Sequence, residues 1–203
     1  MSLSGVIGSS LILILAALYN VPENSYFRIM HKVDVSAIKT AKLLLRSFSN
    51  NDLENVFKGL SDPDVIKYYG ISYSTLESTK EQMQFFSDLE SNNTGKWWAI
   101  CSLDNKTFYG AAGLNNISLQ HKKGEIGFWL LPEFWRKGTI AQAIPMICKY
   151  GYDNMGLHKL EAFVESENVN CKKAMAKLNF LHEGTMEDCE IKKWRIYQFG
   201  HLC

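Results

Sequence analysis

The hydrophobic pattern is densest in one strand-like run near the middle of the chain. Apolar residues cover Ile126–Leu131 almost without interruption, and Pro132 ends the run. Such a run is typical of a strand covered on both faces, and proline ends it because it has no N–H for the sheet ladder. From Thr139 the apolar positions follow helical spacing, at Ile140, Ala143, Ile144 and Ile147. We therefore expect a buried strand, a short loop and a helix.

The residues before this strand alternate between helical and extended patterns. A strand is predicted at 42–47, and Asn51 or Asp52 can cap a helix whose apolar face is Leu53, Val56, Phe57 and Leu60. Ser74 and Glu77 form a capping-box pattern that opens a second helix, with Leu76, Met83, Phe86 and Leu89 expected inside. Two strands, at 97–103 and 107–114, flank a turn and predict a hairpin.

The residues after the central helix complete a mixed order of elements. The pattern predicts a strand at 159–164, a helix at 168–178, and strands at 181–185 and 194–199. The strands at 97–103, 107–114 and 124–131 are expected to form an antiparallel meander, which the helix from Thr139 leaves as a crossover. We expect one α/β (α+β) domain, at 36–203.

Residues 1–35 form an apolar extension of a different kind. The stretch Leu11–Leu18 is too short to span a bilayer. A secretory signal would require basic residues near its start, but no Lys or Arg precedes Arg28. We expect this extension to pack on the domain or on a partner chain, as in a homodimer. No membrane partner is predicted.

Composition narrows the class of protein. With 46% hydrophobic and 21% charged residues, the 203-residue chain is typical of a globular protein. A net charge of +1 argues against a broad nucleic-acid surface. Five cysteines, without a C-x-x-C pair, indicate reduced thiols and a cytoplasmic location. No metal site is predicted.

The loop between the central strand and the helix has the composition of an anion site. Arg136, Lys137 and Gly138 supply charge and close backbone approach, and free N–H groups are expected at the start of the helix, at Thr139, Ile140 and Ala141. An ordinary strand-to-helix connection would have the same outline, so both interpretations stay open.

Three motifs in order resemble the GCN5-related N-acetyltransferases, specifically the RimJ/RimL branch. They are GEIGFWLLPEFWRKGTIAQA at 124–143, GLHKLEAFVESENVNCKKAMAKLNF at 156–180 and, more weakly, residues 41–70. The resemblance implies a mixed, mostly antiparallel sheet flanked by helices, with acetyl-CoA as cosubstrate. It places the pyrophosphate on the basic loop and helix start. It also implies that backbone groups of Trp129, Leu130 and Leu131 contact the pantetheine and the thioester, with a bulge freeing N–H groups.

The resemblance also implies roles for side chains. Glu125 stands where a general base is often found, and burial would raise its pKa, although a solvated carboxylate is the alternative. Glu161 is a weaker candidate, and His158 fits a surface role better. Asn168 would bond the pantetheine, cap a helix, or do both. Cys171 replaces a serine of the branch, and a first-turn position would lower its pKa and let it protonate the leaving thiolate.

Aromatic residues and departures from the family pattern complete the picture. Tyr68, Tyr69 and Tyr73 either pack under a loop or form one wall of the acceptor groove. The departures are Ile140 where a small residue is usual, Pro145 inside the helix, Met175 where relatives carry a tyrosine acid, and Asn179 where glycine is usual.

Three functions follow from these observations. The first is acetyl transfer to a protein or peptide N-terminal amine. The second is acetylation of a small amine such as a polyamine or an antibiotic. The third is a non-catalytic acetyl-CoA-binding module.

Overall fold

The computed structural model describes residues 37–192 and 195–203, which belong to the unit Val35–Cys203. The apolar extension predicted at 1–35 lies outside the described residues. Within them, eight strands form one sheet in the order β1-β2-β3-β4-β5-β6-β8-β7. The elements are β1 (Ala37–Lys39), β2 (Leu43–Arg46), η1 (Asn50–Asp52), α3 (Leu53–Ser61), α4 (Pro63–Ile66), α5 (Leu76–Ser91), β3 (Lys96–Ser102), β4 (Phe108–Ser118), β5 (Lys123–Leu130), η2 (Pro132–Phe134), α6 (Thr139–Met155), β6 (Lys159–Glu165), α7 (Val169–Lys177), β7 (His182–Lys192) and β8 (Arg195–Leu202).

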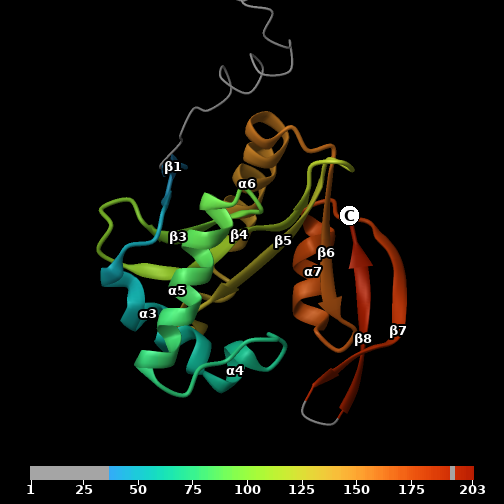
Figure 1. Cartoon of the computed structure of the whole chain (residues 1–203), viewed down its shortest axis with the longest axis horizontal. Helices are drawn as coiled ribbons and strands as arrows, with labels where there is room; N and C mark the ends of the chain where they lie inside the picture. Colours follow the sequence, from blue (N-terminus) through green and yellow to red (C-terminus); the bar gives the residue numbers. More distant parts are fainter. Residues whose placement is uncertain (1–36, 193–194) are drawn as a thin grey trace, which may run out of the picture. The chain divides into compact units, whose positions relative to one another are not determined.

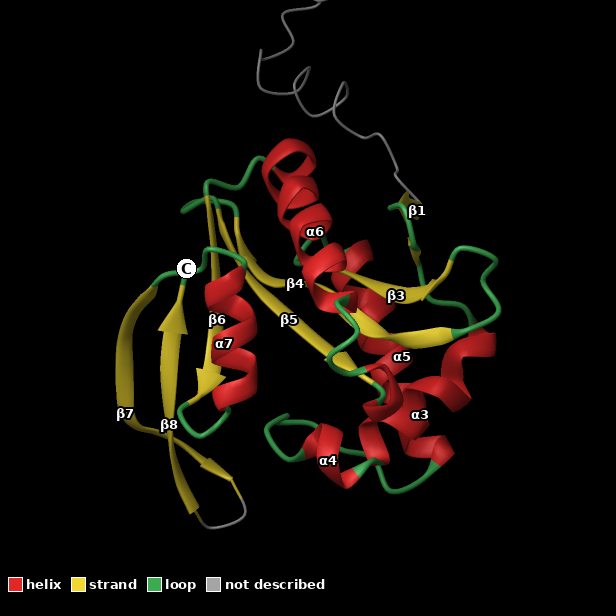
Figure 2. Ribbon diagram, turned by 180° about the vertical axis from the view of Figure 1, so that it is seen from behind, coloured by secondary structure: helices red, strands yellow, loops and turns green. Residues whose placement is uncertain are grey.

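Helices cover both faces of the sheet. Figure 1 views the face that carries α3 and α5, and Figure 2 views the opposite face, with α6 and α7. The predicted mixed α/β fold and the antiparallel β3-β4-β5 meander are confirmed, and β5 then pairs with β6 in parallel. The crossover between β5 and β6 contains α6, as expected for a parallel connection.

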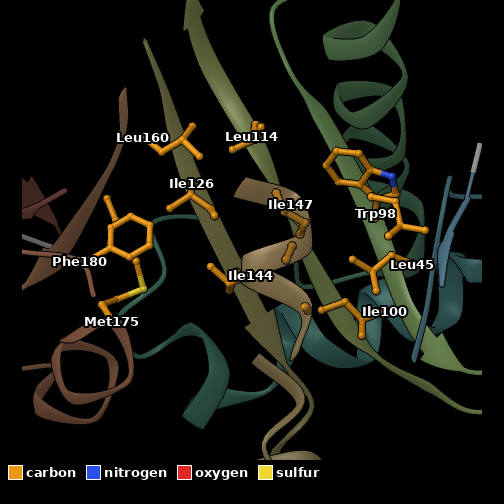
Figure 3. Close-up of a cluster of buried hydrophobic side chains, with 14 of the residues drawn as sticks. Leu45, Trp98, Ile100, Leu114, Ile126, Ile144, Ile147, Leu160, Met175 and Phe180 are labelled. Carbon is orange, nitrogen blue, oxygen red and sulfur yellow. The ribbon is translucent and has the colours of Figure 1, made fainter. Parts of the chain in front are cut away.

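The central strand is buried on both faces, as its apolar run predicts. Ile126 and Leu130 belong to the core under α6, whereas Trp129 and Leu131 belong to the core under α3 and α5. Figure 3 shows Ile144 and Ile147 of α6 reaching toward the sheet beside Ile126. Alternate residues of a strand point to opposite faces, so β5 joins the two cores.

Strands β5 and β6 pair over a short distance and then separate. Their parallel register covers Lys123–Glu125 against Lys159–Glu161, and the two strands diverge beyond it (Figure 1). The antiparallel register of β5 with β4 stays regular up to Gly110 opposite Leu130. One edge of β5 therefore leaves the sheet ladder after Glu125.

Several local expectations needed correction. Leu76 is 39% exposed, because the helix begins there and its buried face starts one turn later, at Thr79 and Gln82. The capping box of α5 is formed by Thr75 and Ser78 in place of Ser74 and Glu77. Strand β1 had no clear pattern in its three residues, and β7 and β8 are longer than predicted. No helix in the described part of the chain is long and apolar enough to cross a membrane.

Candidate active site

The free edge of β5 presents backbone groups of alternate residues. The Leu131 N–H donates to the Tyr109 carbonyl oxygen on the β4 side at 2.9 Å. Neighbouring residues of a strand direct their backbone groups to opposite edges, so those of Leu130, Phe128 and Ile126 lie on the edge toward β6. This edge can pair with the amides of an extended ligand.

This geometry corrects the backbone roles predicted for two residues. Leu131 already uses its N–H within the sheet, and by the same alternation Trp129 also faces β4, so neither provides a free donor at the open edge. The bulge implied by the resemblance is also misplaced. The irregularity between β4 and β5 lies at Asn115–Ser118, opposite the start of β5. The edge is instead freed by the divergence of β5 and β6.

An indole ring closes the end of this edge. Trp135 donates its Nε1–H to the Leu130 carbonyl oxygen at 2.8 Å, and its side chain is 39% exposed. The bond ties the basic loop to the last residue of β5. Sequence reasoning missed Trp135, because nothing in the local pattern distinguishes it from the neighbouring aromatic residues.

The start of α6 has the features of a phosphate cradle. Its N-cap is Gly138, with φ +78°, and no side chain caps the helix. Among the described residues, a Cβ at Gly138 would meet nothing within 4 Å, so they leave the space in front of the helix open. The first intrahelical bond runs from Gln142 N–H to Gly138 O, which leaves the N–H groups of the preceding turn outside the ladder.

The side chains around the cradle also suit an anion. Arg136, with φ +60°, and Lys137 are exposed in the loop, and the Lys137 ammonium lies 5.5 Å from the Phe134 ring centre. Thr139 is buried and Ala141 is exposed, and the partly buried Ile140 packs against the core under α6. Helix dipole, free N–H groups and two cations together favour a diphosphate.

Glu125 lies at the start of β5, where the pairing with β6 ends. Its Oε2 accepts a hydrogen bond from Asn116 Nδ2 at 2.7 Å. Asn116 has φ +51° and lies in the irregular segment of β4, a conformation that asparagine tolerates better than most residues. The side chain of Glu125 is half-buried. The sequence analysis did not identify Asn116. The Asn115-Asn116 pair inside a strand could have indicated the irregular segment of β4, because asparagine is uncommon in regular strands.

The predicted aromatic residues divide into different environments. Tyr69 and Tyr73 pack partly against the core under α3 and α5. Burial raises the pKa of Tyr69, and the charges of Tyr73 and Glu125 add to the rise, so Glu125 and Tyr69 lie within electrostatic reach. Tyr73 donates its hydroxyl to Gln82 Oε1 at 3.2 Å. The Lys67 ammonium lies 4.9 Å from the ring centre of Tyr68.

Asn168 and Cys171 meet at the start of α7. Asn168 is the N-cap, and its Oδ1 accepts from the Cys171 N–H at 3.1 Å. The structure thus gives Asn168 a capping role, and its contact with a cofactor stays a prediction. Burial raises the pKa of Cys171 to about 12. The predicted lowering of this pKa is therefore wrong, because desolvation of the thiolate outweighs the helix terminus.

The remaining candidates and departures have structural roles. Met175 is fully buried, and its sulfur lies beside the ring of Phe180 (Figure 3). His158 is exposed and contacts the His121 carbonyl oxygen through Nε2 at 3.0 Å. Asn179 adopts φ +64° after the end of α7, a left-handed conformation that asparagine accepts in place of glycine. Helix α6 continues through Pro145, which is exposed.

Glu161 belongs to a network of ion pairs and does not lie among the aromatic residues Tyr68, Tyr69 and Tyr73. Its Oε1 accepts from Lys123 Nζ at 2.7 Å, and its Oε2 lies 3.1 Å from His201 Nε2. Burial opposes ionisation, but these two partners outweigh it and lower the pKa of Glu161. A carboxylate with a lowered pKa is a weaker base, so Glu161 is poorly suited to accept a proton from an amine.

Comparisons with known proteins agree with this geometry. The family model described as an acetyltransferase (GNAT) domain matches residues 42–181. The N-acetyltransferase YoaA of Bacillus subtilis (strain 168) is 29% identical over 150 residues, which cover 73% of this chain and 85% of YoaA.

Solved structures share the fold. A GNAT-family acetyltransferase from Bacillus anthracis superposes with a TM-score of 0.72 at 25% identity, covering 82% of this chain and 96% of its own. RimL, the ribosomal L7/L12 alpha-N-protein acetyltransferase in complex with coenzyme A, gives 0.73 at 16% identity and covers 82% and 96%. Spermidine N-acetyltransferase from Vibrio cholerae, with CoA and spermine, gives 0.71 at 18% identity and covers 80% and 95%.

Members of the matched family transfer acetyl groups from acetyl-CoA, and the open edge of β5 and the cradle before α6 suit that cosubstrate. The chain belongs to the GNAT family of acetyltransferases.

Proposed function

We propose that this N-acetyltransferase acetylates the N-terminal α-amine of a protein or peptide by direct transfer, with Glu125 as general base. The observation that supports the proposal best is the position of Glu125. Its carboxylate is half-buried at the point where β5 and β6 separate, and it accepts a hydrogen bond from Asn116. Its charge also contributes to the raised pKa of Tyr69.

In this proposal one set of residues binds acetyl-CoA and Glu125 removes the proton of the acceptor. Arg136, Lys137 and the first turn of α6 would hold the diphosphate of acetyl-CoA, and the β6-facing edge at Leu130 would hold its pantetheine amides. Bound acetyl-CoA supplies an activated acetyl group as a thioester. Glu125 accepts the proton that the acceptor ammonium must lose before its nitrogen can attack.

Proton chemistry favours an α-amine as acceptor. An α-amine with a pKa near 8 costs about 1.4 kcal/mol to deprotonate at pH 7, whereas an alkylamine near 10.4 costs about 4.6 kcal/mol. A single carboxylate such as Glu125 meets the first requirement more easily.

The charges near the aromatic residues keep a second class of acceptor in view. Glu125 acts on Tyr69 and Glu81 acts on Tyr73, while Asp64 and Glu167 act on Lys67, whose ammonium lies over the ring of Tyr68. A polyamine carries several positive charges and needs an acidic groove. Because the fold is also similar to that of a spermidine acetyltransferase, acetylation of a small amine is the second function to be tested.

Thiol release from acetyl-CoA, measured against a panel of acceptors, tests the proposal. Peptides that start with different free α-amines, the same peptides with blocked N-termini, spermidine and an aminoglycoside are compared at pH 7.5. We expect turnover with free N-termini alone. Turnover with spermidine or the aminoglycoside alone would replace this proposal with a small-amine acetyltransferase. Binding of acetyl-CoA without turnover of any acceptor would indicate a non-catalytic module.

A further inference from the structure

Three side chains of different chemistry converge where β6 and β8 pair. They are Glu161 of β6, His201 of β8 and Cys203, which follows β8. One ligand atom from each residue lies within 4.8 Å of the other two. We propose that Glu161, His201 and Cys203 form a binding site for a zinc ion. Thiolate, imidazole and carboxylate are the ligand types that zinc accepts together.

The distances between the donor atoms are close to those of a tetrahedral site. His201 Nε2 lies 3.1 Å from Glu161 Oε2 and 3.4 Å from Cys203 Sγ. With zinc bonds of about 2.0 Å to oxygen and nitrogen and about 2.3 Å to sulfur, tetrahedral geometry separates such atoms by roughly 3.3 to 3.6 Å. Small adjustments of side chains would bring the three donors around one ion.

Neighbouring groups hold the histidine in the orientation that such a site requires. The His201 ring stacks on Phe163 with 5.0 Å between ring centres and 8° between planes. Its Nδ1 lies 3.6 Å from Glu183 Oε2, which is an ion-pair contact rather than a hydrogen bond, and its Nε2 contacts Glu161 and Cys203. A carboxylate on the far nitrogen of a metal-binding histidine is a recurrent feature of zinc sites.

Two lysines surround the cluster and define the alternative. Lys123 pairs with Glu161 Oε1 at 2.7 Å, and Lys159 pairs with Glu183 Oε2 at 2.8 Å. Glu161 keeps its other oxygen directed at His201, so a metal can bind without displacing Lys123. Cys203 also interacts with Glu183 and Lys159, so a polar network without metal is the alternative that the experiment must exclude. What favours a metal site is that Glu161, His201 and Cys203 direct one donor atom each to a common point.

The site would join β6 to β8, next to the strand that carries Glu125. Glu161 is the register partner of Glu125 on the neighbouring strand, and Phe163 pairs with His201 across β6 and β8. A bound ion would fix β8 to β6 one strand away from Glu125. This inference rests on the ligand set and is independent of the acceptor that the enzyme uses.

Cobalt(II) titration of the reduced, chelator-treated full chain tests the site. Cobalt takes the same ligands as zinc and is coloured in tetrahedral thiolate sites. We expect one equivalent to give visible bands and a near-ultraviolet thiolate-to-metal band, both removed by one equivalent of zinc. Cys203→Ser and His201→Gln should each weaken binding at least tenfold, and Cys203→Ser should remove the thiolate band. Glu183→Gln should weaken binding by roughly 10- to 100-fold, as removal of such outer partners does.

Matched controls separate this site from adventitious binding. Cys189→Ser and His158→Gln change an exposed thiol and an exposed imidazole outside the cluster and should titrate like wild type. Failure of the wild-type chain to bind one equivalent of cobalt would overturn the proposal and leave an ion-pair network. So would equal binding by wild type, Cys203→Ser and His201→Gln.

Discussion

The role proposed for Glu125 as a base depends on its immediate surroundings. The Asn116 amide fixes one carboxylate oxygen at 2.7 Å, and the irregular segment of β4 is what brings this amide over the start of β5. In the proposed reaction the other oxygen would accept the proton of the amine. A base held in one orientation loses less entropy when it accepts a proton.

Replacing Glu125 with glutamine should lower kcat by about a hundredfold or more, because the isosteric amide cannot accept the proton of an ammonium. Acetyl-CoA affinity should stay unchanged, and the acid limb of the pH–rate profile should disappear. Steady-state kinetics between pH 5 and 9 provide the measurement, with Glu54→Gln, an exposed carboxylate of α3, as control. A rate equal to wild type would return Glu125 to the role of a surface carboxylate.

Cys171 should contribute little to catalysis. Its thiol pKa of about 12 lies well above that of a leaving thiol near 8.5, so proton transfer between them would be unfavourable. Cys171→Ala should therefore lose less than about tenfold in kcat. In mass-spectrometric labelling, iodoacetamide should modify exposed Cys189 well before Cys171. A hundredfold loss in Cys171→Ala with intact cofactor binding, or an acetylated Cys171, would contradict this view.

At the scale of elements, the two ends of α6 offer a controlled comparison. Gly138 before the helix and Gly156 after it both have positive φ, at +78° and +67°, and both face open space. Backbone strain from a side chain should therefore be similar at the two positions, roughly 1–2 kcal/mol. The two positions differ in what lies in front of them, because only Gly138 borders the free N–H groups.

Gly138→Val should abolish acetyl-CoA binding, because the new side chain occupies the space that a diphosphate needs. Gly156→Val should lose comparable stability in urea unfolding but keep wild-type affinity. Isothermal titration calorimetry with acetyl-CoA distinguishes the two variants. Equal affinity in both would exclude the start of α6 as the diphosphate site.

At the scale of the whole domain, the weakest junction of the sheet, between β5 and β6, is also the proposed cosubstrate site. Three register pairs join β5 to β6, whereas β4 and β5 pair along most of their length. A cosubstrate that lies along the open edge of β5 and contacts α6 would add hydrogen bonds where β5 has no pairing with β6. Binding should therefore stabilise the folded state as a whole.

Acetyl-CoA at a hundred times its dissociation constant should add about 2.7 kcal/mol to the free energy of unfolding. For a domain of this size the melting temperature should rise by roughly 5–10 °C. Differential scanning fluorimetry with acetyl-CoA, and with desulfo-CoA as a comparison, measures the rise. Absence of any rise at millimolar acetyl-CoA would contradict the assignment of the cosubstrate site.

Local sequence patterns predicted most of the elements and the strand, loop and helix that form the candidate site. The apolar run of β5, the helical spacing after Thr139 and the hairpin of β3 and β4 depend on neighbours within a few residues, so their physics is local. The glycine turn before α6 is also a local feature, because glycine adopts a positive φ, here +78° at Gly138, without a steric penalty. The mixed sheet and its crossover followed from the order of these elements.

Other properties depended on tertiary contacts that no spacing reveals. The pairing of Leu131 with Tyr109 decided which backbone groups of β5 are free. Burial under the core reversed the expected direction of the pKa of Cys171. The cluster of Glu161, His201 and Cys203 exists because β6 and β8 pair across about forty residues of chain, and a search for closely spaced ligands could not find it. Strand pairing over such a separation is decided by the packing of the whole domain, because each strand alone has several edges it can join.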